Sequence, residues 1–335
     1  MGSDAPRFHV PSRSLKPVRQ IVIGTSLRSE DDATVRSGLA LAAALEASAH
    51  VLHAVAWEAH GFPLGGSWPD ASVPTRLIEL RTAELAKVLA GTDPGRVTSA
   101  VEAGAPGERI LSAAAELGAG LVVAGAGRHK RSLLGSTADR LMRRATCPVL
   151  IARDPLRVPP GRILAPVDLS ELAADSFRCG LGFLHQVQAE QLGRVEALFV
   201  LSELTRESSG QFRPEQVDRF AREELERFVG EHAAELAGKV GSKLRVGDAR
   251  EQILEEARQA GADLIVIGTH GRAGLERALI GSVTAGVAQG APCSVLVIPP
   301  DVAFGAELVD AVAEQIEPQD WEVPKQETPE PVRSD

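Results

Sequence analysis

The sequence is poor in aromatic residues, and this shortage narrows the class of protein. Tyrosine is absent from the 335 residues, and aromatic side chains make up 4% of the chain. Hydrophobic residues nevertheless reach 44%, so a core must be built from Ala, Val, Leu and Ile. That composition favours buried parallel sheets covered by alanine-rich helices. The length suggests about two domains.

Cysteine is scarce as well. Cys147, Cys179 and Cys293 form no C-x-x-C motif and cannot all pair, so we expect a reducing compartment. The first thirty residues lack the apolar stretch of a secretion signal. No run approaches the about 18 apolar residues of a membrane-spanning helix. These absences predict a cytoplasmic protein with no membrane partner.

The net charge of −9 is concentrated at one end. Residues 301–335 hold ten acidic and two basic residues, whereas residues 1–19 hold four basic and one acidic residue. The remaining body carries no basic stripe, so no nucleic-acid partner is expected. The composition predicts a flexible arm at 1–19 and an acidic tail at 301–335, in which 304–316 could form a helix and 317–335 is disordered.

Between these ends the chain repeats itself. Residues Glu108, Ile110, Leu111, Ala114, Gly118, Ala119 and Leu121 recur 143 positions later as Glu251, Ile253, Leu254, Ala257, Gly261, Ala262 and Leu264. Gly135-Ser136, Cys147 and Val149-Leu150 recur 146 positions later as Gly281-Ser282, Cys293 and Val295-Leu296. The offset grows by three, so the first half lacks three loop residues. The repeat predicts two similar domains, 20–155 and 162–300, joined by a linker at 156–161.

Each half alternates apolar strands with amphipathic helices. The expected strands are Ile21–Gly24, Val51–Val55, Val97–Val101, Leu121–Ala124, Val149–Ile151, Arg162–Val167, Val195–Leu201, Lys243–Val246, one starting at Leu264, and Val295–Ile298. The expected helices are 31–47, Thr75–Ala90, Gly107–Leu117, Ser136–Arg144, 170–188, Pro214–Ala237, Arg250–Gln259 and one starting at Gly281-Ser282. Right-handed crossovers then favour an α/β fold of two tandem, doubly wound, Rossmann-like domains, each with a five-stranded parallel sheet.

The stretch 264–284, LIVIGTHGRAGLERALIGSVT, is the strongest functional signal. A strand, a glycine-bearing loop and a helix start follow one another, which is how α/β folds hold phosphate. The spacing G-x2-G-x9-G-S, formed by Gly268, Gly271 and Gly281-Ser282, is neither a Walker loop nor the G-x-G-x-x-G of dinucleotide folds. The alternative is a connection that needs glycine only for its turn.

These motifs resemble the ATP-binding branch of the universal stress protein family, over roughly 20–155 and 160–300. In that branch the first strand ends with Pro and Asp, as Pro166 and Asp168 do here. The resemblance implies the strand order 3-2-1-4-5 in each half. It also places the ligand at the carboxyl ends of the strands, where the order reverses.

The resemblance implies a role for each site residue. Asp168 would bind the adenosine part and Pro166 would shape the wall, while Val200 and Ile267 would contact adenine. Gly268 and Gly271 would let phosphate approach the loop. His270 and Arg272 lie in the same loop, and their side chains either face the terminal phosphates or extend into solvent. The backbone N–H groups of Gly281, Ser282 and Val283, with the hydroxyls of Ser282 and Thr284, would cradle phosphate. Mg²⁺ would bridge the phosphate oxygens. Asp168 has a second interpretation, as the cap of the helix that follows.

The first half departs from this pattern. Gly24 and Ser26 stand where the second half has Pro166 and Asp168, and the loop is three residues shorter. Gly135-Ser136 is kept, so an anion site remains an alternative. We expect instead a structural first half without nucleotide.

The resulting hypothesis is a tandem universal stress protein that binds ATP in its second domain and regulates a stress response through an unknown protein partner. One alternative is a slow ATPase or a nucleotidyl-transfer enzyme, although no nucleophile and base stand together; His53 is expected to be a core or edge histidine. The other is an interaction protein that uses no nucleotide. The family pairs domains through the last strand, so the two halves of this chain could pair with each other. Two chains could then also associate as a homodimer.

Overall fold

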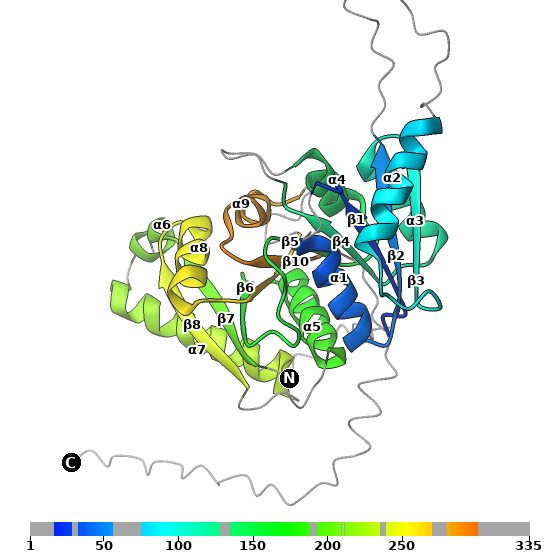
Figure 1. Cartoon of the computed structure of the whole chain (residues 1–335). Helices are drawn as coiled ribbons and strands as arrows, with labels where there is room; N and C mark the ends of the chain where they lie inside the picture. The colour runs from blue at the N-terminus through cyan, green and yellow to red at the C-terminus, as the bar shows by residue number, and fades with distance from the viewer. Residues whose placement is uncertain are drawn as a thin grey trace, which may run out of the picture.

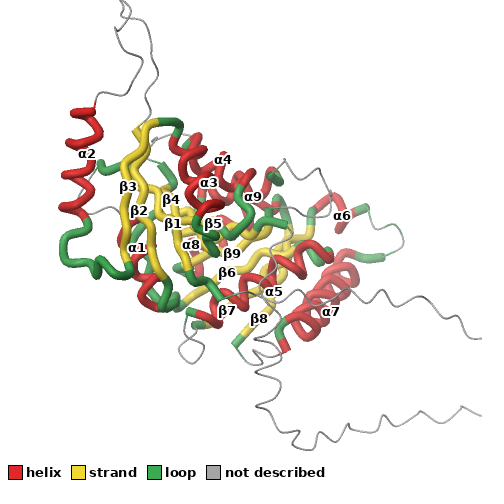
Figure 2. Tube along the Cα trace, turned by 90° about the vertical axis from the view of Figure 1, so that its right-hand side faces the viewer, coloured by secondary structure: helices red, strands yellow, loops and turns green. Residues whose placement is uncertain are grey.

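A computed structural model describes residues 17–28, 33–55, 75–127, 135–187, 193–208, 210, 212–234, 239–269 and 280–300. They form one ten-stranded sheet with helices on both faces (Figure 1; Figure 2). Among the described residues, no helix is long and apolar enough to cross a bilayer. The predicted helix at 304–316, the predicted disorder at 317–335 and the arm up to residue 16 lie outside these ranges.

The first half follows the predicted order of elements. It contains β1 Gln20–Thr25, α1 Ala33–Ala44, β2 Ser48–Val55, α2 Thr75–Val88, β3 Val97–Ala103, α3 Pro106–Glu116, β4 Leu121–Gly125, α4 Ser136–Arg144 and β5 Val149–Ala152. Most boundaries fall within about three residues of the prediction.

The second half repeats this order with one addition. It contains β6 Arg162–Val167, α5 Glu171–Gln186, β7 Arg194–Leu201, α6 Glu203–Glu207, α7 Pro214–His232, β8 Val240–Val246, α8 Ala249–Ala260, β9 Leu264–Gly268, α9 Ser282–Gly290 and β10 Ser294–Ile298. The short helix α6 was not predicted because it buries no residue and therefore shows no apolar periodicity. It begins where the Ser202 hydroxyl accepts a hydrogen bond from the Thr205 amide, 3.1 Å away.

The strand order across the sheet is β3-β2-β1-β4-β5-β10-β9-β6-β7-β8. Within each half this is 3-2-1-4-5, and the strands are parallel. The predicted fold class and strand order are therefore confirmed. The halves join through their last strands, β5 and β10, which pair antiparallel.

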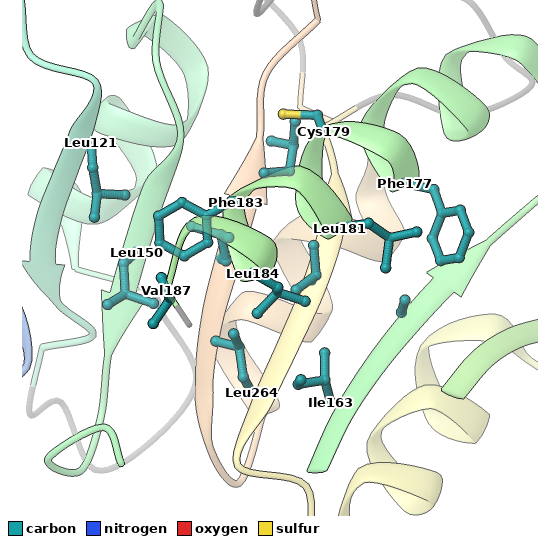
Figure 3. Packing of buried hydrophobic residues seen from close by; sticks show 14 of the residues in the cluster. Leu121, Leu150, Ile163, Phe177, Cys179, Leu181, Phe183, Leu184, Val187 and Leu264 are labelled. Carbon is teal, nitrogen blue, oxygen red and sulfur yellow. The ribbon is translucent and has the colours of Figure 1, made fainter. Parts of the chain in front are cut away.

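Helices cover the sheet in two layers, each with its own buried cluster. The layer with α1, α2, α5 and α7 packs on one face, and the layer with α3, α4, α8 and α9 packs on the other. Figure 3 shows how α5 joins the two halves: Phe183, Leu184 and Val187 lie in one cluster with Leu150 of β5 and Leu264 of β9. The core is therefore continuous across the repeat boundary.

Candidate functional site

A pocket of about 310 Å³ opens at the carboxyl ends of β6, β7 and β9. This is the switch point of the second half, where the strand order reverses. Every predicted site residue that the structure describes lines it: Pro166, Asp168, Val200, Ile267, Gly268, Gly281, Ser282, Val283 and Thr284. Gly271 and Arg272, like His270, lie outside the described residues. The chain thus brings together residues from three strands and the start of α9.

The pocket opens because two adjacent strands stop pairing. The ladder between β6 and β9 ends at Leu164 opposite Ile265, although β6 continues to pair with β7 through Val167. Pro166 lies just beyond the last β6–β9 pair, and proline has no backbone N–H to donate to a ladder. The ends of β6 and β9 are therefore free to line a crevice.

The first half closes at the equivalent place. Its ladder between β1 and β4 runs two pairs further, to Gly24 opposite Ala124. A Cβ atom at Gly24 would lie 2.4 Å from Cδ1 of Ile110, so any larger residue there would have to displace that side chain. On the other side, Oγ1 of Thr34 would lie 2.9 Å from a Cβ at Gly125. Side chains of α3 and α1 therefore approach the strand ends that the second half leaves open.

His53 lies at the same end of the first half. It is buried, and its Nδ1 is 2.9 Å from the backbone oxygen of Thr25, to which it donates a hydrogen bond. The ring is held in the core, as expected for a structural histidine.

Asp168 is fixed in a tight turn beside the pocket. Its Oδ1 accepts hydrogen bonds from the backbone N and the Oγ of Ser170, at 3.1 and 2.6 Å. Ser170 in turn caps α5 by accepting from the Ala173 amide. The interpretation of Asp168 as the helix cap is therefore wrong. Leu169, between them, has a φ of 62°, a left-handed conformation that costs about 1–2 kcal/mol for a residue with a Cβ.

Two hydrogen-bond donors at the start of α9, which were predicted to bind phosphate, are occupied by the protein itself. The Gly281 N–H, predicted to be free for phosphate, donates to the backbone oxygen of Thr269 at 2.8 Å. The Thr284 hydroxyl donates to the oxygen of Gly268 at 2.6 Å. Both bonds tie the helix start to the end of β9. In the described part of the chain, the amides of Ser282 and Val283 have no acceptor, so they remain available to an anion.

Gly281 itself has a φ of −58°, which any residue can adopt. A side chain at this position would nevertheless be crowded, because an added Cβ would lie 3.2 Å from the backbone oxygen of Thr269. Among the described residues, which omit 128–134, a Cβ at the equivalent Gly135 would meet nothing closer than 3.8 Å. In this part of the chain the close approach is found at Gly281 and not at Gly135.

The pocket also includes residues that the motif did not indicate. Ser176 and Phe177 come from α5, and Ala249 and Ile253 come from α8. Both helices start at the carboxyl edge of the sheet, so their first turns face the crevice. The repeat held a signal for one of them, since Ile253 corresponds to Ile110, which covers Gly24 in the first half.

Two buried cysteines of the described residues can be excluded as nucleophiles. Burial raises the pKa of the Cys147 and Cys293 thiols to about 12 in both cases. Such thiols stay protonated and unreactive. Within the described ranges, no group of three His, Cys, Asp or Glu side chains could hold a metal ion.

Comparison with known proteins identifies the class that this fold and site define. The model of the universal stress protein family matches residues 17–153 and again residues 160–299, so the chain belongs to that family, in tandem form. A universal stress protein of Methanocaldococcus jannaschii is 32% identical over 154 residues, which covers 41% of this chain and 81% of the relative.

Solved structures share the fold over almost the whole chain. A protein of unknown function from Pseudomonas aeruginosa PAO1 covers 89% of this chain and 98% of its own, with a TM-score of 0.62 and 18% identity. A universal stress protein from Archaeoglobus fulgidus covers 86% of this chain and 98% of its own, with a TM-score of 0.57 and 19% identity. At these identities the likeness concerns the fold alone.

Proposed function

We propose that this universal stress protein binds one ATP per chain, in the pocket of the second half, and acts as a nucleotide-dependent regulator whose state a protein partner reads. The observation that carries the proposal is the early end of the β6–β9 ladder at Leu164 and Ile265. It opens a crevice in the second half, at the place where the first half is paired and covered. The volume of about 310 Å³ lies at the lower end of the range for small-molecule sites.

We assign a part of the nucleotide to each wall of the pocket. Val200 and Ile267 offer apolar surface to the base, beside Pro166. The Asp168 carboxylate, fixed by Ser170, is an acceptor for the ribose hydroxyls. Polar groups held in one orientation at the edge of an apolar pocket give a site its specificity.

The phosphates are assigned to the start of α9. Ser282 and Val283 line the pocket, and their amides, which have no acceptor among the described residues, form the positive end of the helix dipole, where anions are stabilised. The Ser282 hydroxyl adds a donor. Gly268 allows close approach, whereas the phosphate roles that the family resemblance implies for Gly271 and Arg272 stay predictions, because both lie outside the described residues. Mg²⁺ would be held chiefly by phosphate oxygens. Thr284 takes a different role from the one first assigned, since its hydroxyl holds the helix start against β9.

Calorimetric titration of ATP into the full chain tests this proposal. We expect one site per chain. Asp168→Asn keeps the acceptor for Ser170 but removes the charge, and should weaken ATP binding about tenfold or more, because hydrogen bonds to charged groups contribute about 1.5–3 kcal/mol. Ser26→Ala, at the equivalent position of the first half, is the matched control and should change nothing.

Two results would contradict the proposal. Two equal sites per chain would show that the two halves do not differ in binding. The absence of any heat of binding would show that the chain does not bind ATP. Phosphate release, followed in the same samples, separates a binding protein from an ATPase. If the pocket hydrolyses ATP, the wild type releases phosphate and the Asp168→Asn variant loses turnover as well as affinity.

A further inference from the structure

One side chain of the first half reaches the far end of the helix that faces the pocket. Arg153 directly follows β5, and its Nη2 donates to the backbone oxygen of Ala288 at 2.6 Å and to that of Gln289. These carbonyls belong to the last turn of α9. The Arg153 backbone N also donates to Oγ of Ser294, at the start of β10, 3.3 Å away. Arg153 is therefore bound to the second half by both main chain and side chain.

The helix α9 depends on this residue for charge. Its nine residues, SVTAGVAQG, include no ionisable side chain, and its last turn has no basic residue of its own. The last carbonyls of a helix lack partners and form the negative end of its dipole, where a cation is stabilising. Arg153 supplies that cation from the other half of the chain.

The guanidinium of Arg153 is partly withdrawn from solvent where it meets α9. Arg153 is partly buried, and its Nε atom is buried with no hydrogen-bond partner in the described part of the chain. Burial lowers the pKa of Arg153, although an arginine stays charged at any ordinary pH. A cation is thus held out of water, and the two carbonyls of α9 offset its desolvation.

The packing of α9 allows one end to influence the other. A Cβ at Gly286 would lie 2.5 Å from Cδ of Arg250, and a Cβ at Gly290 would lie 2.7 Å from Cδ1 of Leu254. Val287 between them is fully buried. A helix of nine residues is about 13 Å long. Packed this closely on α8, α9 moves as a unit, so a shift of its last turn also moves its first turn.

The first half has no such link. The position equivalent to Arg153, 146 residues later, is Pro299, which has no cation to offer. The helix equivalent to α9 is α4, and it carries Arg143 and Arg144 in its own last turn. Among the residues that the structure describes, this cross-half contact is therefore made to α9, the helix that faces the open pocket, and not to α4.

We propose that Arg153 is a positioning residue for phosphate: it holds α9 from the first half, so that the first-turn amides of Ser282 and Val283 face the pocket. The inference rests on the proposed function. It makes the first half part of the nucleotide site, although that half holds no nucleotide itself. A phosphate bound at the start of α9 and the cation at its end stabilise the same helix dipole from opposite ends.

The test compares two ligands on the full chain by calorimetry. Arg153→Met keeps much of the side chain's length and apolar contact but removes the charge and the donors. We expect it to weaken ATP binding about two- to fivefold, the usual range for a charge at a helix terminus, and to leave adenosine binding unchanged, because adenosine has no phosphate. Arg153→Lys should recover part of the loss. Arg144→Met, in the last turn of α4, is the matched control and should change neither ligand.

The outcomes separate this inference from the proposed function. If wild type binds no ATP, both fall. If wild type binds ATP and Arg153→Met binds it equally well, only the inference is wrong. Equal weakening of ATP and adenosine would also overturn it, because a general loss of structure would then explain the effect. Thermal melting of each variant without ligand accompanies the titrations.

Discussion

Leu150 of β5 and Leu296 of β10 lie directly opposite each other in the antiparallel ladder that joins the two halves. They are also the same position of the repeat, 146 residues apart. An approximate twofold axis therefore passes between them, and the two halves associate as two subunits would. The expectation that the halves pair internally through their last strands is confirmed. The same contact occupies both last-strand edges, so a homodimer needs another surface.

This axis relates the open switch point of the second half to the paired one of the first half. Pro166 lacks the backbone N–H that its counterpart in the first half, Gly24, has. Pro166→Ala restores an N–H, which allows β6 and β9 to pair further, as β1 and β4 do at Gly24. A ladder hydrogen bond contributes about 0.5–1.5 kcal/mol. We therefore expect ATP to bind up to about tenfold more weakly, with no loss of thermal stability in the free protein.

Calorimetry and melting of Pro166→Ala measure both quantities. Pro155→Ala, at an exposed position just before the linker, is a control for the general effect of removing a proline. Unchanged affinity in Pro166→Ala would mean that the crevice is held open by something other than the missing donor.

Thr284 separates positioning from direct phosphate contact. Its buried hydroxyl donates to the Gly268 oxygen, so Thr284→Val should lower the free energy of unfolding by about 1 kcal/mol and weaken ATP binding as the helix start loosens from β9. Thr284→Ser keeps the hydroxyl and should preserve most of the stability and most of the ATP affinity. Chemical denaturation measures the stability, and calorimetric titration measures the affinity. A Thr284→Val protein with normal stability but no ATP binding would show instead that the hydroxyl contacts phosphate.

The buried thiols predict how stability depends on pH. The folded-state pKa values of Cys147 and Cys293, about 12, lie above the ordinary value of 9.0. Their contribution is therefore complete below pH 9 and is lost as the pH rises from 9 toward 12, because the unfolded chain releases the protons first. At pH 10 the loss should be on the order of 1 kcal/mol per thiol.

Urea unfolding at pH 8 and pH 10 measures this loss, with the Cys147→Ala, Cys293→Ala double variant as the reference. The wild type should lose more stability than the double variant over this interval. Equal losses would mean that these thiols ionise in the folded protein as readily as in the unfolded chain.

Much of the fold could be predicted because the repeat and the apolar runs are local signals. The 143- and 146-residue offsets predicted two halves, and the run at 264–268 with Gly281-Ser282 located the switch point. The hydrogen bonds that occupy the Gly281 amide and the Thr284 hydroxyl could not be predicted. They depend on where the end of β9 lies relative to α9, which packing decides. Arg153 was overlooked because nothing in the sequence around the end of β5 indicates that this arginine reaches a distant helix.

The central claim is that nucleotide binds at the start of α9 and not at its counterpart in the first half. The glycine pair tests it most directly. Gly281 lines the pocket, where phosphate must approach a backbone amide to about 2.7–3.2 Å, and the Cβ of Gly281→Val would lie 3.2 Å from the Thr269 oxygen. The Cβ of Gly135→Val meets no described atom closer than 3.8 Å.

The measurement is calorimetric titration of ATP into wild type and both variants, with thermal melting of the free proteins. We predict that Gly281→Val weakens binding about a hundredfold or more, since it removes at least two charge-assisted contacts, and that Gly135→Val binds as wild type does. Both variants should remain folded. Unchanged ATP affinity in a folded Gly281→Val protein, or its loss in Gly135→Val, would contradict the account.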